Sequence, residues 1–308
     1  MPAAGYPLEP IRVEGISRSN PLKAARAVVR AGGALVAARA ILARHEPDAV
    51  LGGGGYVAGP VGLAAVARRI PLVLTEADSH LGLTNRLLAR AARRVCLAFP
   101  LEGREPPRYR VTGRAVPPTD TDRAGARAGF GLAGDDLVVL VFGGSLGARS
   151  INLAAADAFA DAPFRVLHIA GRRDFEAVRE RVGDRPHYVL RDYVTPFGRA
   201  LAAADLAVAR AGGSVFELAQ YGLPSVLIPY PHASADHQTT NADWMVRGGA
   251  AVTIRDAELT GEGLARTVGE IVHDRPRLAH MAAAAEALAR PDAAAQIAGE
   301  VLAAARER

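Results

Sequence analysis

The sequence predicts an α/β fold of two doubly wound, Rossmann-like domains that face a cleft. Short apolar runs alternate with stretches of helical character along the 308 residues, as expected for βαβ units that build parallel sheets. Glycine-rich turns follow an apolar run in each half, at residues 52–55 and 143–147. A polar, proline-rich stretch at 116–122 breaks the pattern, which then restarts. Because ligands of such sheets bind beyond the carboxyl ends of the strands, both turns are expected to face the cleft.

The first half begins with a helix and continues with alternating elements. Ser19-Asn20-Pro21 predicts a helix start, because Ser and Asn cap helices and proline is favoured at the first helical position. The alanine-rich helix that follows is expected to end near His45. Further helices are expected from near Pro60 and over 84–94. Four strands are expected at 48–51, 72–75, 95–99 and 109–112.

The second half begins after the proline-rich linker. Residues 137–142 form an uninterrupted apolar run, typical of a strand covered on both faces. Five more strands, separated by helices, are expected at 165–169, 187–191, 205–209, 225–228 and 251–254. The tail is helical from about Thr260, and its last helix is expected to pack back on the first domain. The predicted division is a first domain, a second domain and a C-terminal helical segment, at 1–118, 119–290 and 291–308.

Bulk composition narrows the class of protein. Half of the residues are hydrophobic, yet no apolar run approaches the ~18–20 residues that span a bilayer. The first residues lack the basic and apolar segments of a secretory signal, so a cytoplasmic protein is expected. The single cysteine, Cys96, excludes an internal disulfide and a multi-cysteine zinc site, and is expected in the core. Neither GxGxxG nor a Walker P-loop occurs, which argues against a standard dehydrogenase or NTPase.

The net charge of +5 is unevenly distributed. Residues 1–118 hold 17 Lys+Arg and 8 Asp+Glu, a balance of +9, and the remainder holds 20 and 24, a balance of −4. A basic first half suggests an anionic partner, either a membrane surface or nucleic acid, with a merely solvated arginine-rich surface as the alternative. Nucleic acid is the weakest of these interpretations, because the basic residues have no interleaved aromatic residues.

The stretch 210–219 is the strongest candidate for chemistry. It follows an apolar run, breaks at Gly212-Gly213 and opens a helix. A strand that turns into a helix in this way presents backbone N–H groups that suit a phosphate. Glu217, about one turn into the helix, can accept hydrogen bonds from both hydroxyls of a ribose. The alternative is a tight turn followed by an ordinary acid in the first turn of a helix.

Five stretches, in order along the chain, resemble one known family. They are 51–60 (Leu-Gly-Gly-Gly-Gly-Tyr-Val-Ala-Gly-Pro), 82–85 (Gly-Leu-Thr-Asn), 143–152, 210–219 and 236–241. Together they resemble the MurG family of GT-B glycosyltransferases over nearly the whole chain. The resemblance implies inverting transfer of N-acetylglucosamine (GlcNAc) from UDP-GlcNAc to lipid I, which is undecaprenyl-pyrophosphoryl-MurNAc-pentapeptide. The product is lipid II, the peptidoglycan precursor on which the cell wall, cell shape and cell division depend.

The resemblance also assigns donor-binding roles in the second half. Ser145 would approach the nucleotide phosphates, and Val194 would offer backbone groups to the uracil. Gln238 and Asn241 would hold GlcNAc hydroxyls, and their spacing on one helix lets both reach the same sugar, with ordinary helix capping as the alternative. The residues that would line the nucleotide, with Glu217 on the ribose, are Gly213, Ser214, Val215, Phe216 and Glu217. No protein-bound metal or other cofactor is implied.

In the first half the resemblance implies an acceptor pocket that backbone amides shape. Its residues are Gly53, Gly54, Gly55, Tyr56 and Asp78. Asp78 stands where the family usually has Asn, and an ionised carboxylate can only accept hydrogen bonds. Pro117 replaces an arginine of the family, for which Arg114 is a candidate substitute.

Two features of the family bear on catalysis and location. The family begins with a strand and a glycine-rich loop that carries a histidine, and this chain starts about 60 residues too late to contain them, judged from the length of βαβ units. Two explanations are open: a start codon assigned too far downstream, or a chain that lacks this segment. A truncated version of a complete enzyme is the expected case, with its first domain incomplete. No catalytic base is assigned. His80 is a possible substitute on the acceptor side, although a surface-loop histidine is the preferred interpretation.

Lipid I lies in the inner leaflet of the cytoplasmic membrane, so a peripheral membrane contact is expected. Six arginines flank apolar residues such as Leu87 and Leu88 in the first half, which suits such a contact. They are Arg68, Arg69, Arg86, Arg90, Arg93 and Arg94. Two alternatives to the lipid I transferase stay open. A related GT-B enzyme with another UDP-sugar or lipid acceptor is favoured by Asp78 and Pro117, and a catalytically silent UDP-sugar-binding protein by the missing histidine loop.

Overall fold

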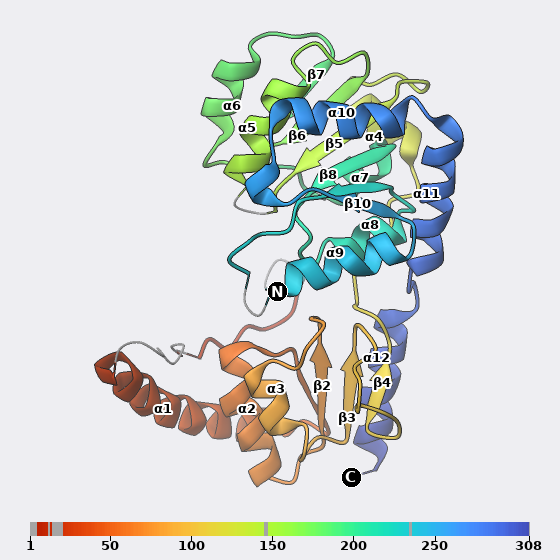
Figure 1. The fold of residues 1–308 in the computed structure, drawn as a ribbon. Coiled ribbons are helices and arrows are strands. Elements are labelled where there is room, and N and C mark those ends of the chain that lie inside the picture. Colours follow the sequence, from red (N-terminus) through yellow and green to blue (C-terminus); the bar gives the residue numbers. More distant parts are fainter. Residues whose placement is uncertain (1–4, 12, 14–20, 145–146, 234–235, 308) are drawn as a thin grey trace. The chain divides into compact units, whose positions relative to one another are not determined.

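The computed structural model describes residues 5–11, 13, 21–144, 147–233 and 236–307 and divides into two compact units (Figure 1). Unit 1 comprises Met1–Ala115 with Asp292–Arg308, and unit 2 comprises Val116–Pro291. Each unit holds one sheet, and the strand pairs of both sheets are parallel. Among the helices described, none combines the length and the apolar character that a membrane span requires.

Unit 1 contains a four-stranded sheet with strands in chain order. They are β1 (Val50–Gly52), β2 (Leu72–Glu76), β3 (Arg94–Leu97) and β4 (Tyr109–Val111). The helices are α1 (Pro21–His45), α2 (Gly55–Ala67), α3 (Leu83–Leu88) and α12 (Ala293–Arg306). Because side chains alternate along a strand, one face of β2 and β3 packs on Leu88 of α3 and the other face packs on α12.

The face against α12 contains Cys96, which is buried with Val73, Ile297 and Ala304. This agrees with a core position for the only cysteine. Burial raises the pKa of the Cys96 thiol to about 11, so the thiol stays protonated at neutral pH.

Helix α2 begins earlier than the sequence pattern predicts. It starts at Gly55 and includes Pro60, whereas the glycines had suggested a loop up to that proline. The reason is close packing of α2 on α3. A Cβ at position 62 would lie 2.5 Å from Cδ1 of Leu88, and one at position 59 would lie 3.7 Å from Cγ2 of Thr84. Gly62 therefore serves the helix–helix contact rather than a turn, whereas a Cβ at position 59 would make only an ordinary van der Waals contact.

Unit 2 contains a six-stranded sheet of order β10-β9-β8-β5-β6-β7. Its strands are β5 (Val138–Phe142), β6 (Arg165–Ile169), β7 (Tyr188–Arg191), β8 (Leu206–Ala209), β9 (Ser225–Leu227) and β10 (Ala251–Thr253). Numbered from β5, this is the doubly wound order 3-2-1-4-5-6, which reverses direction between β5 and β8. Ligands of such sheets bind at this switch point, beyond the carboxyl ends of the two strands.

Helices cover the sheet of unit 2. They are α4 (Arg123–Gly129), α5 (Arg149–Ala158), α6 (Phe175–Val182), α7 (Gly198–Ala203), α8 (Val215–Gln220), α9 (His237–Arg247), α10 (Gly261–Val272) and α11 (Arg275–Leu288), with the short 3₁₀ helix η3 (Asp256–Glu258). The strands of both units lie where the sequence predicts them, with ends that differ by at most two residues. The predicted α/β fold of two parallel-sheet domains is thereby confirmed.

Candidate functional site

The switch point of unit 2 brings two glycine-rich loops together. Gly143–Ala148 follows β5 and Arg210–Ser214 follows β8, and these strands are hydrogen-bonded neighbours, with Phe142 paired to Ala209 at their carboxyl ends. Both loops were singled out from the sequence. Ser145 lies outside the described residues, so its predicted contact with the nucleotide phosphates stays a prediction.

The loop after β8 uses some of its amides internally. The amide of Val215 donates to the carbonyl of Gly212 at 3.2 Å, and that of Phe216 donates to Gly213 at 3.3 Å. The amides of Gly213 and Ser214 donate to no acceptor among the described residues. Gly213 and Ser214 are half-buried. Their two N–H groups are therefore among the donors that this loop can offer to an anionic ligand.

The side chains of Val215 and Phe216 belong to the core rather than to the loop surface. Val215 is fully buried, and the ring of Phe216 packs on Trp244 with centroids 5.2 Å apart. Contact of either residue with a nucleotide would therefore come from its backbone. Glu217 is half-buried in the first turn of α8, where a carboxylate remains reachable.

Helix α9 places two amide side chains beside the loop after β8. Nδ2 of Asn241 donates to the carbonyl of Ala211 at 3.0 Å, and Oε1 of Gln238 accepts from the amide of Tyr230 at 3.0 Å. Oδ1 of Asn241 is buried and has no hydrogen-bond partner in the described structure. A buried acceptor without a hydrogen bond destabilises the folded protein, and a ligand hydroxyl that donates to it would remove this destabilisation.

Arg210 connects the ends of several strands. Nη1 donates to the carbonyls of Ile228 and Pro229 at 3.1 and 3.2 Å and to Oδ1 of Asp256 at 2.6 Å. Nη2 donates to Oγ of Ser150 at 2.8 Å, and that hydroxyl donates to Oδ1 of Asp256 at 2.7 Å. The triad Arg210–Ser150–Asp256 thus ties the loop after β8 to α5, to the segment after β9 and to η3.

A second polar network connects α5, β6 and β7 beside the loop that follows β5. Nδ2 of Asn152 donates to the carbonyl of Ala170 at 2.8 Å and to Oδ2 of Asp174 at 3.2 Å. Since both partners are acceptors, Oδ1 of Asn152 must accept, and it lies 3.0 Å from Nε2 of His168. Nε2 therefore carries the proton, and Nδ1 accepts from the Tyr188 hydroxyl at 2.7 Å.

Burial keeps His168 neutral in this network by lowering its pKa to about 3, and it raises the pKa of Tyr188. The carboxylate of Asp174 closes the chain of hydrogen bonds. Arg173 donates to it, and this bond holds the pKa of Asp174 below its usual range. The network fixes Ala170, whose carbonyl faces Gly147 of the glycine-rich loop.

Val194 lies in the segment after β7, half-buried, at the edge of the sheet away from β8. Its predicted contact with uracil is not tested by any described interaction.

In unit 1 the glycines after β1 meet the segment after β2. Gly54 and Gly55 have positive φ values of 78° and 72°, and Thr84 Oγ1 donates to the carbonyl of Gly55 at 3.1 Å. A Cβ at position 54 would lie 3.5 Å from Nδ2 of Asn85. Tyr56 follows in the first turn of α2 with an exposed side chain. This geometry makes the carboxyl ends of β1 and β2 the candidate acceptor side.

Glu76 organises the loop that carries the other acceptor-side residues. It is buried and accepts from the amide of Gly82 and from Nδ2 of Asn85, both at 2.9 Å, and from the amide of Asp78 at 3.3 Å. Asp78 and His80 are half-buried on this loop. Oδ1 of Asn85 is a second buried acceptor without a partner in the described structure.

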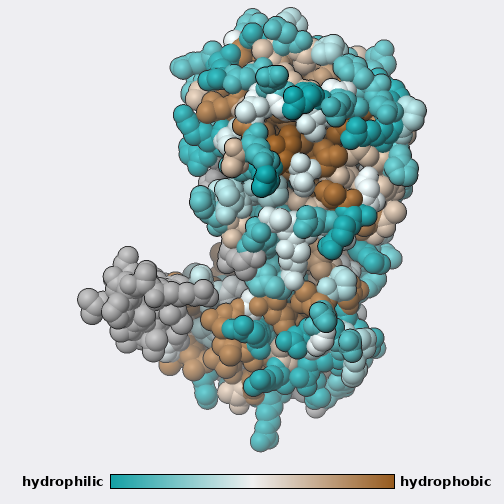
Figure 2. Space-filling view, in the orientation of Figure 1, coloured by the Kyte–Doolittle hydropathy of each residue, from teal (hydrophilic) through white to brown (hydrophobic). Residues whose placement is uncertain are grey.

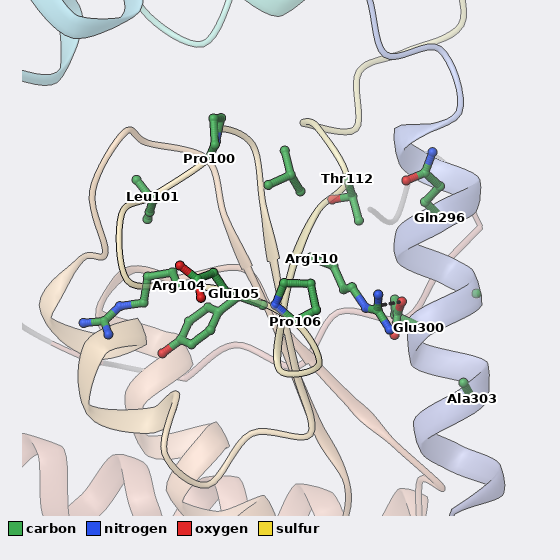
Figure 3. Close-up of a pocket in the computed structure, with 13 residues that line it drawn as sticks. Pro100, Leu101, Arg104, Glu105, Pro106, Arg110, Thr112, Gln296, Glu300 and Ala303 are labelled. Carbon is green, nitrogen blue, oxygen red and sulfur yellow. Dashed lines mark ion pairs between the residues drawn. The ribbon is translucent and has the colours of Figure 1, made fainter.

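Unit 1 also contains a hollow of about 730 Å³ between β4 and α12 (Figure 3). Arg110 and Glu300 face each other across it, with Nε and Oε1 3.7 Å apart. Arg104 stacks over the ring of Tyr109 at 5.5 Å. None of the residues predicted for the donor or acceptor lines this hollow.

Sequence reasoning assigned no role to five residues that organise these sites. They are Glu76, Asn85, Asn152, Arg210 and Asp256. Asn85, Asn152 and Arg210 lie in stretches already noted for the resemblance, so a polar residue inside such a motif was the available signal. Glu76 lies two residues before Asp78, which the resemblance also singled out. Asp256 lies in none of these stretches, and only the sheet order brings it to Arg210.

The two units match known families and relatives. The model of the glycosyltransferase family 28 C-terminal domain matches residues 138–297, and that of the N-terminal domain matches residues 1–97. A protein of Moorella thermoacetica is 43% identical over 95% of this chain and 84% of its own length, and one of Alkalilimnicola ehrlichii is 42% identical over 97% and 85%. Both are named UDP-N-acetylglucosamine–N-acetylmuramyl-(pentapeptide) pyrophosphoryl-undecaprenol N-acetylglucosamine transferase.

A solved structure agrees with these matches. The crystal structure of Acinetobacter baumannii MurG has a TM-score of 0.73 and 31% identity, and the match covers 90% of this chain and 79% of that one. High identity over most of both lengths, together with both domain models, leads to one conclusion. The chain belongs to the MurG family of glycosyltransferases.

Proposed function

We propose that this protein transfers GlcNAc from UDP-GlcNAc to lipid I and so makes lipid II for peptidoglycan synthesis. The observation that carries the proposal is the membership of the chain in a family whose named members are transferases of this kind, with identity that extends over both units. A role in cell shape and division would follow from that product.

The donor half of the proposal rests on unit 2. The amides of Gly213 and Ser214 would meet the diphosphate, and Glu217 would accept from the ribose hydroxyls. The orphaned Oδ1 of Asn241 would accept from a GlcNAc hydroxyl, with Gln238 one helical turn earlier on the same side. The triad Arg210–Ser150–Asp256 would hold these parts in register.

The proposed chemistry is attack of an acceptor hydroxyl on the anomeric carbon as UDP leaves. One C–O bond forms, the bond between the anomeric carbon and the diphosphate oxygen breaks, and the hydroxyl proton passes to a base. Negative charge then develops on the departing diphosphate, where N–H donors stabilise it. We propose that these donors suffice without a protein-bound metal, and activity that persists in EDTA is the expected result. No residue is assigned as the base.

The acceptor half of the proposal rests on unit 1. The amide side chain of Asn85, whose Oδ1 is buried without a partner in the described structure, lies beside Gly54, and backbone amides of the loop Gly53–Gly55 would meet the acceptor's diphosphate. Asp78 and His80 stand on the loop that Glu76 holds.

We further propose that unit 1 docks peripherally on the membrane that carries lipid I. Figure 2 shows apolar side chains at the surface over α2, beside hydrophilic ones. The exposed apolar residues of α2 and α3 are Tyr56, Val57, Leu63, Val66, Leu83 and Leu87. Exposed arginines accompany them, including Arg68, Arg69, Arg86 and Arg90. An apolar surface beside cationic side chains suits the interface of an anionic bilayer.

A transfer assay tests the proposal directly. Purified protein, UDP-GlcNAc with a labelled sugar and a lipid I analogue should yield a labelled lipid II analogue. UDP-GalNAc in place of UDP-GlcNAc and a polyprenyl phosphate in place of lipid I are the matched controls. Transfer only with the controls would favour a related enzyme, and binding of UDP-GlcNAc without transfer would favour a silent binding protein.

A further inference from the structure

A hollow of about 320 Å³ in unit 1 has arginines on several sides. Arg90 and Arg93 come from the turn after α3, Arg94 from the start of β3, and Arg108 from the segment just before β4. Small residues and a proline complete the lining. The four arginines define what we call the arginine hollow.

The sheet holds these residues in place. The amide of Arg93 donates to the carbonyl of Leu72 at 2.8 Å, and the carbonyl of Arg108 accepts from the amide of Val95 at 2.8 Å. Val95 is paired with Tyr109 in the parallel register, so Arg94 and Arg108, one residue earlier on each chain segment, are neighbours. Like charges placed side by side on adjacent segments repel each other. A bound anion between the guanidinium groups would relieve this repulsion.

The nearby carboxylates neutralise only part of this charge. Nε of Arg94 lies 3.1 Å from Oε2 of Glu300, and Nη2 lies 3.8 Å from Oε1 of Glu307. Glu300 is shared with Arg110, as Figure 3 shows. Among the described residues, no carboxylate forms an ion pair with Arg90, Arg93 or Arg108, and all three are exposed. In the part of the chain that the structure describes, the hollow thus keeps three guanidinium groups without an acidic partner.

The arginine hollow lies apart from the candidate acceptor side within unit 1. It is at the amino ends of β3 and β4, whereas Gly53–Gly55 and the Glu76–Asn85 cluster follow the carboxyl ends of β1 and β2. In a parallel sheet the amino ends and the carboxyl ends of the strands lie at opposite ends of the sheet. A ligand in the hollow would therefore not be the group that reacts.

We propose that the arginine hollow binds a phosphate group. Guanidinium groups present paired N–H donors in a planar fork that matches phosphate oxygens, and several forks around one concavity can share the same anion. The phosphate could belong to a soluble anion or to the headgroup of an anionic lipid. Only the second source rests on the proposed membrane docking of unit 1.

The first experiment uses inorganic phosphate as the probe. Full-length protein is titrated while NMR follows the arginine Nε–Hε signals. Saturable shifts are expected, and they should be lost in the double variant Arg93→Ala/Arg108→Ala. The control Arg39→Ala/Arg266→Ala removes the same charge from exposed positions of α1 and α10, outside both the hollow and the proposed docking surface, and should keep the shifts.

The second experiment uses vesicles of phosphatidylcholine with and without phosphatidylglycerol. At low ionic strength each arginine near an anionic surface contributes about fivefold to binding, so the hollow variant should bind the anionic vesicles about 25-fold more weakly. The control variant should lose distinctly less. Free phosphate should compete with the vesicles for the wild-type protein.

The outcomes separate the two sources. Loss in both experiments identifies a lipid headgroup, and loss of free phosphate binding alone identifies a soluble anion. Equal behaviour of the hollow and control variants in both experiments would overturn the proposal, because the attraction would then be spread over the whole surface. If circular dichroism shows that the alanine variant is unfolded, Arg93→Gln/Arg108→Gln replaces it. Wild-type protein that binds phosphate but transfers no GlcNAc would overturn the proposed function and leave the hollow standing.

Discussion

The guanidinium of Arg210 donates a 2.6 Å hydrogen bond to the carboxylate of Asp256, a residue 46 positions further along the chain. Both side chains are largely buried. The bond joins the loop after β8 to the segment after β10, and Ser150 completes the triad from α5. The amides of Gly213 and Ser214 depend on this connection for their position, because Arg210 begins the loop that carries them.

Asp256→Asn should therefore weaken the donor site without unfolding unit 2. The change keeps the size of the side chain and removes a charge-assisted hydrogen bond of about 1.5–3 kcal/mol, so the KM for UDP-GlcNAc should rise about tenfold. The control is Glu258→Gln, which breaks the exposed ion pair with Arg255 in the same segment. A lower melting temperature with an unchanged KM would show that the triad is merely structural, and recovery of KM in Asp256→Glu would support a positioning role.

Glu217→Gln should lower the affinity for UDP more than tenfold. Two hydrogen bonds from ribose hydroxyls to a carboxylate are weakened when the charge is removed, at about 1.5–3 kcal/mol for a bond to a charged group. Calorimetric titration with UDP measures the effect. Glu262→Gln in the first turn of α10 is the matched control, because it removes the same charge from the same kind of helix position. If both variants bind UDP like the wild type, Glu217 is an ordinary first-turn acid.

Most strands could be predicted because they are apolar runs that cross a buried sheet, such as β5 and β8. Strand β4 is an exception, because it contains Arg110 and none of its residues is buried. The start of helix α2 could not be predicted as accurately, because the run of glycines at 52–55 and the proline at position 60 are typical of a loop, whereas the helix begins at Gly55. The triad Arg210–Ser150–Asp256 was beyond sequence reasoning for a different reason. Its members meet only because β10, β9, β8 and β5 are neighbours in the sheet, and one sequence does not determine that order.

Some features of the candidate site could be predicted from the sequence and others could not. The loops after β5 and β8 could be located from their glycines. The sequence could not reveal that the side chains of Val215 and Phe216 are buried and that only their backbone can reach a ligand. That became clear only from the structure, in which Phe216 packs on Trp244. The orphaned oxygens of Asn85 and Asn241 likewise depend on which neighbours take the amide nitrogen.

Gly147→Ala should disrupt the donor loop more than Gly144→Ala. Both glycines have positive φ, 75° and 99°, so both substitutions incur a backbone cost of roughly 1–2 kcal/mol. Only at 147 would the new Cβ also lie 2.3 Å from the carbonyl of Ala170, whereas at 144 no atom of the described residues lies within 4 Å. That carbonyl accepts from Asn152 and cannot move freely.

The excess destabilisation of Gly147→Ala over Gly144→Ala should be about 1–3 kcal/mol, in the range of an overpacked core. Urea unfolding followed by the fluorescence of Trp244, the only tryptophan, measures it within unit 2. Equal free energies of unfolding for the two variants would contradict the close approach of Gly147 to β6.

Asn85→Asp should destabilise unit 1 and weaken the acceptor side. The new carboxylate would face Oε2 of Glu76 in place of an amide that donates to it at 2.9 Å. A lost donor at a buried site costs about 1–3 kcal/mol, and like charges add to the cost. The defect should shrink as the pH falls, because a proton on either carboxyl restores a donor. Hydrogen exchange of the β2 and α3 amides is the measurement, and Glu76→Gln/Asn85→Asp should restore part of the protection.

His168 should make unit 2 less stable in mild acid. Its pKa is about 3 in the folded protein because burial disfavours the charged imidazolium, against about 6.5 in an unfolded chain. Below pH 6.5 the unfolded chain therefore binds a proton that the folded chain does not. The stability of unit 2 is complete above pH 6.5 and declines as the pH falls from 6.5 toward 3.

At pH 5 the loss from this one group amounts to about 2 kcal/mol. Urea titrations of Trp244 fluorescence at pH 7.5 and at pH 5 measure how much the free energy of unfolding falls between these pH values. This fall should be about 2 kcal/mol smaller in His168→Gln than in the wild type. Gln can still donate to Asn152 but does not titrate. His280→Gln, at an exposed position of α11, should keep the wild-type difference. A wild-type difference that persists in His168→Gln would mean that other groups cause the acid sensitivity and that His168 does not stay neutral as the network requires.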